Sequence, residues 1–338
     1  MKLVSHPHFT EDELVRAIRK VLSGEAPGVL VSVGDDAAVV EPGSHELVLT
    51  SDMLVEGVHF DVRAVSAHDL GHKSITVSVS DIAAMGGSPR YGLVSLALPR
   101  AAETAWVMEL YGGVRQAADE YGMAVVGGDT SRGDRYVVSV SAVGTVGRGK
   151  AVTRSGARPG DQLVVTGALG AASGGLRLAT EPPHEVRGAL GSPWGRALVR
   201  AYLRPVARVG EGETLGQLGA TAMIDLSDGL GLDLARLCRE SGVGASLRLA
   251  DVPVALGLEE LGQLLGVDAL DQALHGGEDY ELLACLPPQA VEPARERLRD
   301  RFGTPLTAVG EITDDDLVAV RADGTREPLE PKGWDHFA

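Results

Sequence analysis

Eight carboxylate residues stand in short runs where apolar stretches give way to Gly, Ser or Thr, a setting in which an acid can hold a metal ion. An acid on a solvated surface needs no such neighbours. An acid at the end of a buried strand, beside a glycine that lets a ligand approach, suits a hard cation. Oxygen ligands with few His or Cys nearby favour Mg²⁺, Ca²⁺ or Mn²⁺ over zinc. The eight are Asp35, Asp36, Asp52, Asp81, Asp129, Asp225, Asp228 and Glu278.

Each of these acids, taken alone, has an ordinary structural explanation. Asp36 or Asp52 could form a turn or cap a helix, and Asp228 could cap the helix expected after it. Asp81 is harder to explain in this way, because an acid inside a helix among Val, Ile and Ala gains nothing structurally. The joint pattern therefore favours a shared metal site that the fold assembles from distant segments.

Three other residues near these acids could bind a phosphate or a planar ligand. Arg154, in TRSGARPGD, carries the planar donor fork that suits phosphate, although a surface charge in a linker explains it equally well. His59, in VEGVHF, could be a structural or surface histidine. Trp334, in KGWDHF, either anchors the tail or stacks on a planar ligand.

The familiar nucleotide-binding motifs are absent from the sequence. It contains no GxxxxGK[ST], no GxGxxG at the spacing of a dinucleotide fold, and no protein-kinase HRD or DFG. The Gly-rich segment 167–175 is better explained as a turn that starts a helix. If phosphates bind, metal ions and backbone amides must hold them.

Composition and charge exclude several classes of partner. A net charge of −16 argues against non-specific binding to nucleic acid or to an anionic membrane surface. A phosphate substrate would be repelled by this charge unless divalent cations were bound. Cys238 and Cys285 stand in apolar contexts and are expected to be buried free thiols. With no signal pattern and no long apolar run, the protein is expected to be cytoplasmic.

The pattern of elements predicts two domains that each mix strands and helices. The Gly-, Arg- and Pro-rich stretch 147–161 is the best boundary, giving domains 1–148 and 149–338. Thr10 and Glu13 form a capping box for an opening helix that Gly24 ends. Further helices are expected at 67–85, 102–121, 195–203, 211–218, 229–240 and 291–302, with a helical pair around 258–274. Strands are expected at 37–40, 47–50, 123–126, 136–146, 162–166, 222–225, 245–249 and 280–286, with two more near the end.

Ordered motifs along the chain resemble those of bacterial thiamine-monophosphate kinases. They are GDDAAVV, TSDMLVEGVHF, KSITVSVSDIAAMGGSPR, VVGGDTSRG, TRSGARPGD, IDLSDGL, GGEDYEL and KGWDHF. The match runs from about residue 9 to the C-terminus. GDD and GGD occur throughout a superfamily that includes aminoimidazole-ribonucleotide synthetase, selenophosphate synthetase and the hydrogenase-maturation dehydratase. VEGVHF, GGEDYEL and KGWDHF resemble the thiamine branch more specifically.

The resemblance implies a two-domain, mixed α+β and α/β fold of the aminoimidazole-ribonucleotide synthetase type. The N-terminal domain is expected to form a homodimer through a β-barrel that spans the two-fold axis. The implied Mg²⁺ ligands are Asp36, Thr50, Ser51, Asp52, Asp81, Asp129, Asp225 and Asp228. The implied ATP contacts are Gly128, Arg154, Ser227 and, from its approximate place only, Tyr111. The implied substrate contacts are His59, Glu278 and Trp334, where the family commonly has Tyr instead of Trp.

The expected activity is phosphorylation of thiamine monophosphate to thiamine diphosphate by ATP, with several Mg²⁺ ions, in thiamine diphosphate biosynthesis. The acceptor phosphate has a second pKa near ~6 and is already nucleophilic at neutral pH, so no general base is required. Direct in-line transfer without a phosphoenzyme is expected, with Asp36, Asp129, Arg154 and Asp228 as candidate catalytic residues. Another ATP-using member of the superfamily and a non-catalytic module binding Ca²⁺ or nucleotide are the alternatives.

Overall fold

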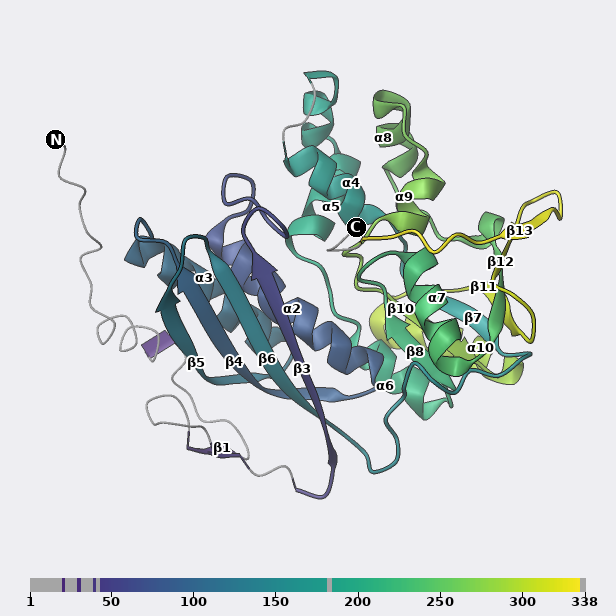
Figure 1. The fold of residues 1–338 in the computed structure, drawn as a ribbon, viewed down its shortest axis with the longest axis horizontal. Helices are drawn as coiled ribbons and strands as arrows, with labels where there is room; N and C mark the ends of the chain where they lie inside the picture. Colours follow the sequence, from purple (N-terminus) through teal and green to yellow (C-terminus); the bar gives the residue numbers. More distant parts are fainter. Residues whose placement is uncertain (1–19, 22–28, 32–38, 41–42, 181–183, 335–338) are drawn as a thin grey trace. The chain divides into compact units, whose positions relative to one another are not determined.

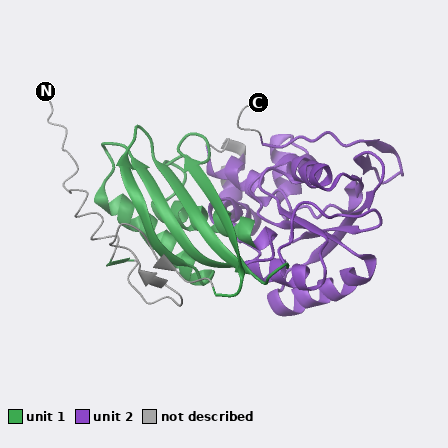
Figure 2. Cartoon of the chain, turned by 60° about the horizontal axis from the view of Figure 1, so that its bottom comes forward, with its two compact units in different colours: residues 1–82, 88–149 green, residues 83–87, 150–338 purple. Residues whose placement is uncertain are grey.

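The structure is a computed structural model that describes residues 20–21, 29–31, 39–40, 43–180 and 184–334 (Figure 1). The start of the expected opening helix, Asp35, Asp36 and the last four residues, 335–338, lie outside this part of the chain. The described chain divides into two compact units, coloured separately in Figure 2. The first holds the residues up to Ile82 together with Ser88–Gly149, and the second holds Ala83–Gly87 and the chain from Lys150 onward.

A four-stranded mixed sheet, in the order β3-β6-β4-β5, forms the first unit. Strand β6 pairs antiparallel with β3 and with β4, and β4 pairs parallel with β5. Helices α2 and α3 lie behind this sheet in Figure 1. The bounds are β3 Glu46–Val55, α2 Ala67–Ala84, β4 Ser88–Leu98, α3 Thr104–Glu120, β5 Ala124–Arg132 and β6 Val137–Val146, with a separate β1–β2 pair at Val29–Val31 and Val39–Val40.

Helices α2 and α3 cross closely because each has a glycine at the contact. A Cβ on Gly71 would lie 1.9 Å from the carbonyl oxygen of Leu110, and one on Gly113 would lie 1.8 Å from that of His68. No larger side chain fits at either position without moving a backbone. Ser66 caps α2 through its hydroxyl, which accepts the N–H of Asp69 at 3.0 Å. This cap confirms the predicted start of the helix.

The sheet of the first unit is open, with β3 and β5 at its edges. The described part of the single chain therefore contains no closed barrel, and a barrel spanning two chains stays a proposal. One face of the sheet carries Leu49, Met53 and Leu93, which are 71%, 55% and 42% exposed. On the other face, Val48, Leu54, Val94 and Val140 are buried. The alternation along β3 thus separates a helix-covered face from an uncovered apolar face.

The second unit is built on a seven-stranded sheet in the order β13-β12-β9-β11-β7-β10-β8. Its pairs are antiparallel except for β12 with β9. The strands are β7 Gln162–Thr166, β8 Ala222–Asp225, β9 Gly244–Arg248, β10 Leu282–Leu286, β11 Leu306–Thr313, β12 Val318–Val320 and β13 Arg326–Pro328. The helices are α4 Ala171–Ala179, η1 His184–Gly191, α5 Pro193–Leu203, α6 Val209–Gln217, α7 Leu230–Ser241, η2 Leu249–Asp251, α8 Leu258–Leu265, α9 Ala269–His275 and α10 Pro288–Phe302.

Two apolar cores cover opposite faces of this second sheet. Leu163 and Val165 of β7 pack in one core with residues of α7, whereas Val164 packs in the other with residues of α6 and α10. All five residues of β10 are buried, as expected for a strand covered on both faces. The predominance of antiparallel pairs makes the fold α+β with mixed sheets. None of the helices in the described ranges is long and apolar enough to cross a membrane.

The two cysteines lie in this unit and are buried free thiols, as predicted. Burial raises the pKa of the Cys238 thiol to about 11 and that of Cys285 higher still. Neither sulfur therefore carries a thiolate at neutral pH, which agrees with a packing role.

Candidate functional site

In the first unit, β3 and α2 bring two of the predicted carboxylates together. Thr50 and Asp52 share the face of β3 that α2 covers. The Thr50 hydroxyl donates to Asp81 on α2, and the Ser78 hydroxyl donates to Asp52 at 2.7 Å. Burial, followed by the negative charge of Asp81, raises the pKa of Asp52 to about 6. The two acids are thus close enough to repel one another, an arrangement that a bound cation would relieve.

Ser51 points to the opposite face of β3 from Thr50 and Asp52. Its hydroxyl lies 3.2 Å from the hydroxyl of Ser141 on β6. The structure therefore does not bring the Ser51 hydroxyl to the carboxylates with which the sequence grouped it. The two-residue period of a strand is the reason, since consecutive side chains leave opposite faces.

Asp129 and Gly128 lie inside β5, although the sequence placed them at a strand end. Asp129 is exposed, and its backbone pairs with Ser95 of β4. A Cβ on Gly128 would lie 1.8 Å from the carbonyl oxygen of Val94, so only glycine fits there. This close approach of two backbones is the reason that the second glycine of VVGGDTSRG cannot be a larger residue.

The VEGVHF turn fixes the ring of His59. The backbone N–H of Val55 donates to Nδ1 of His59 at 3.0 Å, and the N–H of His59 donates to the Val55 carbonyl at 2.9 Å. Because Nδ1 accepts, the neutral ring carries its proton on Nε2 and presents a donor there. Tyr111 differs: its side chain is 3% exposed in the core of this unit, and burial raises the pKa of its phenol. Tyr111 thus offers a ligand little surface.

In the second unit, backbone contacts join three of the predicted motifs. IDLSDGL follows β8, and the N–H of Glu278 in GGEDYEL donates to the Ser227 carbonyl at 2.8 Å. The N–H of Trp334 in KGWDHF donates to the Asp228 carbonyl at 3.0 Å. Asp225, the last residue of β8, is 3% exposed, and Trp334 is 50% exposed. Segments far apart in the sequence therefore meet at the end of β8.

Asp228 has two partners that the sequence did not indicate. Its carboxylate accepts from Arg236, which also donates to Asp233 at 2.8 Å. The Asp228 N–H donates to Asp233 at 3.0 Å, and burial raises the pKa of Asp233 to about 6. Asp228 does not cap α7, because Gly229 is the N-cap residue. The three-residue spacing of Asp233 and Arg236, which places both on one helix face, is the sequence feature that could have indicated this ion pair.

The GGEDYEL loop has a strained backbone. Among the described residues, Glu278 and Tyr280 are the non-glycine residues with positive φ, at 69° and 52°. Each such conformation costs roughly 1–3 kcal/mol and persists only where the surroundings enforce it. Strain of this kind is concentrated at functional sites, which supports a role for this loop.

Arg154, the candidate for a phosphate contact, is exposed, and its backbone carbonyl accepts a hydrogen bond from the Ser241 hydroxyl at 2.8 Å.

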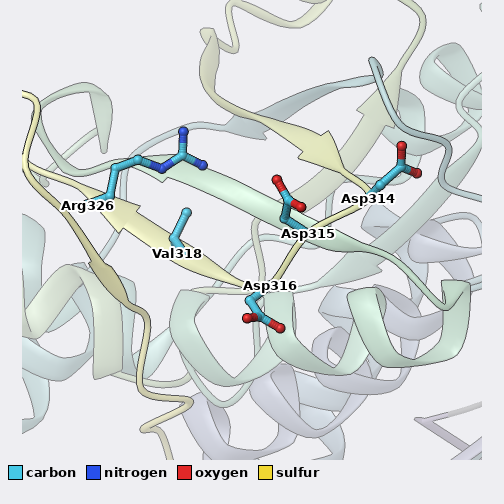
Figure 3. Close-up of a pocket in the computed structure, with 5 residues that line it drawn as sticks. All are labelled: Asp314, Asp315, Asp316, Val318 and Arg326. Atoms are coloured by element: carbon cyan, nitrogen blue, oxygen red, sulfur yellow. The ribbon is translucent and has the colours of Figure 1, made fainter.

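No three His, Cys, Asp or Glu side chains in the described ranges are grouped so that they could hold a metal ion by themselves. A surface pocket in the second unit, shown in Figure 3, is lined by Asp314, Asp315, Asp316, Val318 and Arg326. It contains none of the predicted site residues.

Both halves of the chain match models of one class of two-domain proteins. Residues 34–146 match the AIR synthase related protein, N-terminal domain, and residues 158–323 match the corresponding C-terminal domain. The thiamine-monophosphate kinase of Aquifex aeolicus is 36% identical over 96% of this chain and 97% of its own length.

Two solved structures extend the comparison to three dimensions. The thiamine-monophosphate kinase of Stenotrophomonas maltophilia has a TM-score of 0.79 and 36% identity, covering 97% of this chain and 99% of its own. AaThiL complexed with AMPPCP and TMP has a TM-score of 0.77 and 34% identity, covering 99% of this chain and 100% of its own. The chain belongs to the thiamine-monophosphate kinase family.

Proposed function

We propose that this protein transfers the terminal phosphoryl group of ATP to thiamine monophosphate, giving ADP and thiamine diphosphate. The observation that carries the proposal is the relationship to the A. aeolicus kinase, at 36% identity over nearly the full length of both chains. AaThiL, which is 34% identical, binds AMPPCP, an ATP analogue, together with TMP. The IDLSDGL and GGEDYEL loops, which the hydrogen bond from the Glu278 N–H to the Ser227 carbonyl joins, support the proposal further.

The residues present suit Mg²⁺ as the cation. Their side chains offer oxygen donors, which hard cations prefer. The proposed ligands are Thr50, Asp52, Asp81 and Asp129 in the first unit and Asp225 and Asp228 in the second. Asp36 and the backbone carbonyl of Ser51 complete the proposed set, which would hold several Mg²⁺ ions. When bound, Mg²⁺ neutralises charge that would otherwise keep the two phosphates apart.

The protein's own groups would bind and orient the two substrates. Arg154 and the backbone at Gly128 and Ser227 would hold ATP phosphates, and Tyr111 is the weakest of the nucleotide candidates because it is buried. His59, with a donor at Nε2, and Glu278 and Trp334 would face thiamine monophosphate. The acceptor phosphate is largely dianionic at neutral pH, so it attacks directly and no phosphoenzyme forms.

The uncovered apolar face of the first unit supports a homodimer. Leu49, Met53 and Leu93 give it an exposed apolar surface, which marks interaction sites on soluble proteins. We place the twofold-related β-barrel here, with a second copy of the chain covering this face. Sedimentation velocity should show a dimer for the wild type and a shift towards monomer for Leu49→Asp. A wild-type monomer at micromolar concentration would contradict this arrangement.

Release of ADP from ATP, measured with and without thiamine monophosphate, tests the kinase proposal. We expect ADP release to depend on thiamine monophosphate and on Mg²⁺. Asp81→Asn should lower kcat by about a hundredfold or more while the protein stays folded, because it removes a charged ligand beside Asp52. ADP release that ignores thiamine monophosphate would indicate another ATP-using member of the superfamily. Full activity of Asp81→Asn would refute the shared metal site.

A further inference from the structure

The loop that carries Glu278 is held by backbone pairing along its length. The N–H groups of Glu278 and Tyr280 donate to the carbonyls of Ser227 and Leu226, at 2.8 and 2.9 Å. The N–H of Leu226 in turn donates to the carbonyl of Glu281 at 2.8 Å. These bonds fix the loop against the end of β8. They do not by themselves explain why two residues in it adopt positive φ.

Asp279 ties the loop to the start of α4. Its Oδ2 accepts from the N–H of Gly170 at 2.6 Å, and its Oδ1 accepts from the N–H of Ala172 at 3.3 Å. Gly170 is the N-cap residue of α4 and has no side chain of its own to cap the helix. Asp279 therefore supplies the missing cap from a distant part of the chain. The amides of Gly170 and Ala172 in the Gly-rich segment therefore donate to a carboxylate of the protein itself.

Glu281 anchors the other end of the loop through a partly buried ion pair with Arg208. Arg208 donates to its carboxylate twice, from Nε at 2.8 Å and from Nη2 at 2.5 Å. The Thr166 hydroxyl donates to the same carboxylate at 2.6 Å and accepts the N–H of Leu282 at 2.8 Å. Glu281 is 6% exposed, so the two-pronged contact is shielded from water. Moving this carboxylate would remove the two-pronged contact and leave the guanidinium its longer ion pair with Glu211, 3.6 Å from Nη1 to Oε1.

The two anchors alternate along the chain with the residues that have positive φ. Glu278 immediately precedes Asp279, and Tyr280 lies between Asp279 and Glu281. Fixing positions 279 and 281 to separate elements leaves the backbone at 278 and 280 little freedom, which is how a strained conformation persists. We propose that Asp279 and Glu281 are positioning residues that hold Glu278 towards the acceptor substrate, with Arg208 as the fixed partner of Glu281. The proposal rests on the proposed kinase function for the role of Glu278.

Steady-state kinetics and hydrogen exchange on the full-length protein test the proposal together. In Asp279→Asn and Glu281→Gln, kcat/KM for thiamine monophosphate should fall about tenfold to a hundredfold, because small displacements of a positioning group have effects of that size. The KM for ATP should change by less than about twofold, since nothing in these variants removes a nucleotide contact. The amides of Glu278 and Tyr280 should exchange faster than in the wild type.

Matched variants separate positioning from a general loss of stability. Arg208→Lys keeps the charge but loses the two-pronged contact, so it should reproduce part of the effect. The double variant Arg208→Met/Glu281→Gln removes both charges of this pair, and Thr304 still donates to the neighbouring Glu211 carboxylate at 2.6 Å, so it should fold even if one single variant does not. Arg299→Met breaks an exposed ion pair with Asp300 and should change neither substrate constant nor loop exchange.

The outcomes distinguish this proposal from the kinase proposal. Unchanged exchange at Glu278 and Tyr280 in every anchor variant would overturn the positioning role, as would equal losses for both substrates in folded variants. If the wild-type protein showed no turnover with thiamine monophosphate, the kinase proposal would fail. Faster loop exchange would then still support the anchors, but their link to the acceptor would be refuted.

Discussion

Replacing Asp279 by Asn should flatten the dependence of stability on pH. Burial is the main reason that the pKa of Asp279 rises from 3.8 to about 7, and the nearby charges of Glu281 and Glu278 raise it further. The N–H groups of Gly170 and Ala172 oppose this rise. Because the folded-state pKa lies above the unfolded one, the folded protein binds the proton more tightly. The resulting stability is complete below the unfolded pKa and is lost as the pH rises through about 7.

The size of the effect follows from the number of protons bound. Between about pH 5.5 and 8 the unfolded carboxylate is ionised and binds almost no proton. The folded carboxyl still binds one for part of this window, and its proton occupancy integrated over the window is about 1.5 pH units. At about 1.4 kcal/mol per unit, this residue lowers the free energy of unfolding by about 2 kcal/mol across that window. Asn cannot titrate, so Asp279→Asn should lack this decline. The window also avoids the isoelectric point near 5.0, where an uncharged protein precipitates.

Urea denaturation of the wild type and of Asp279→Asn at several pH values between about 5.5 and 8 provides the measurement. The difference between the two free energies of unfolding should change by about 2 kcal/mol over the series, with the variant gaining relative to the wild type as the pH rises. Asp268→Asn is the control, because Asp268 caps α9 through the Asp271 N–H at 3.0 Å but is exposed. Parallel pH curves for wild type and Asp279→Asn would refute the reasoning.

Two further predictions concern packing. Gly128→Ala should lower the free energy of unfolding by about 1–3 kcal/mol, because its Cβ would meet the Val94 carbonyl oxygen. Gly188→Ala is the control and should have little effect, because the space around Gly188 is open. Thermal denaturation of the two variants and the wild type provides the measurement. Cys238 and Cys285 should react with a thiol reagent only in denaturant, since both are buried; fast labelling of the native protein, followed by absorbance, would contradict their burial.

The sequence predicted helices and short buried strands well where apolar periodicity was clear. Helix α2 was expected at 67–85 and occupies Ala67–Ala84, and β7 was expected at the residues that form it. Strand β4 was missed, because SPRYGLVSLAL has Pro89 and Arg90 near its start and contains Gly92, which break the pattern of a strand. Strand β3 was expected to end at Thr50 but continues to Val55 through Ser51, which faces away from α2, and Asp52, which faces it.

The candidate site was recognisable from its motifs, but its supporting contacts were not. The grouping of Asp52 with Asp81 depends on how α2 lies against β3, which no local pattern specifies. Arg208 lies 73 residues from Glu281, and Asp279 caps a helix 109 residues away from it at Gly170. Such partners emerge only when the sheet of the second unit is assembled. Ser51 shows a different limit of motifs, because a motif groups neighbouring residues whose side chains a strand sends to opposite faces.

Phosphorus NMR of the wild-type protein with ATP, thiamine monophosphate and Mg²⁺ tests the central claim most directly. The account predicts that the two phosphate signals of thiamine diphosphate grow in equal amounts with ADP, while free phosphate stays at the level of an enzyme-free control. Conversion of ATP to ADP and free phosphate, with thiamine monophosphate unchanged, would contradict the account.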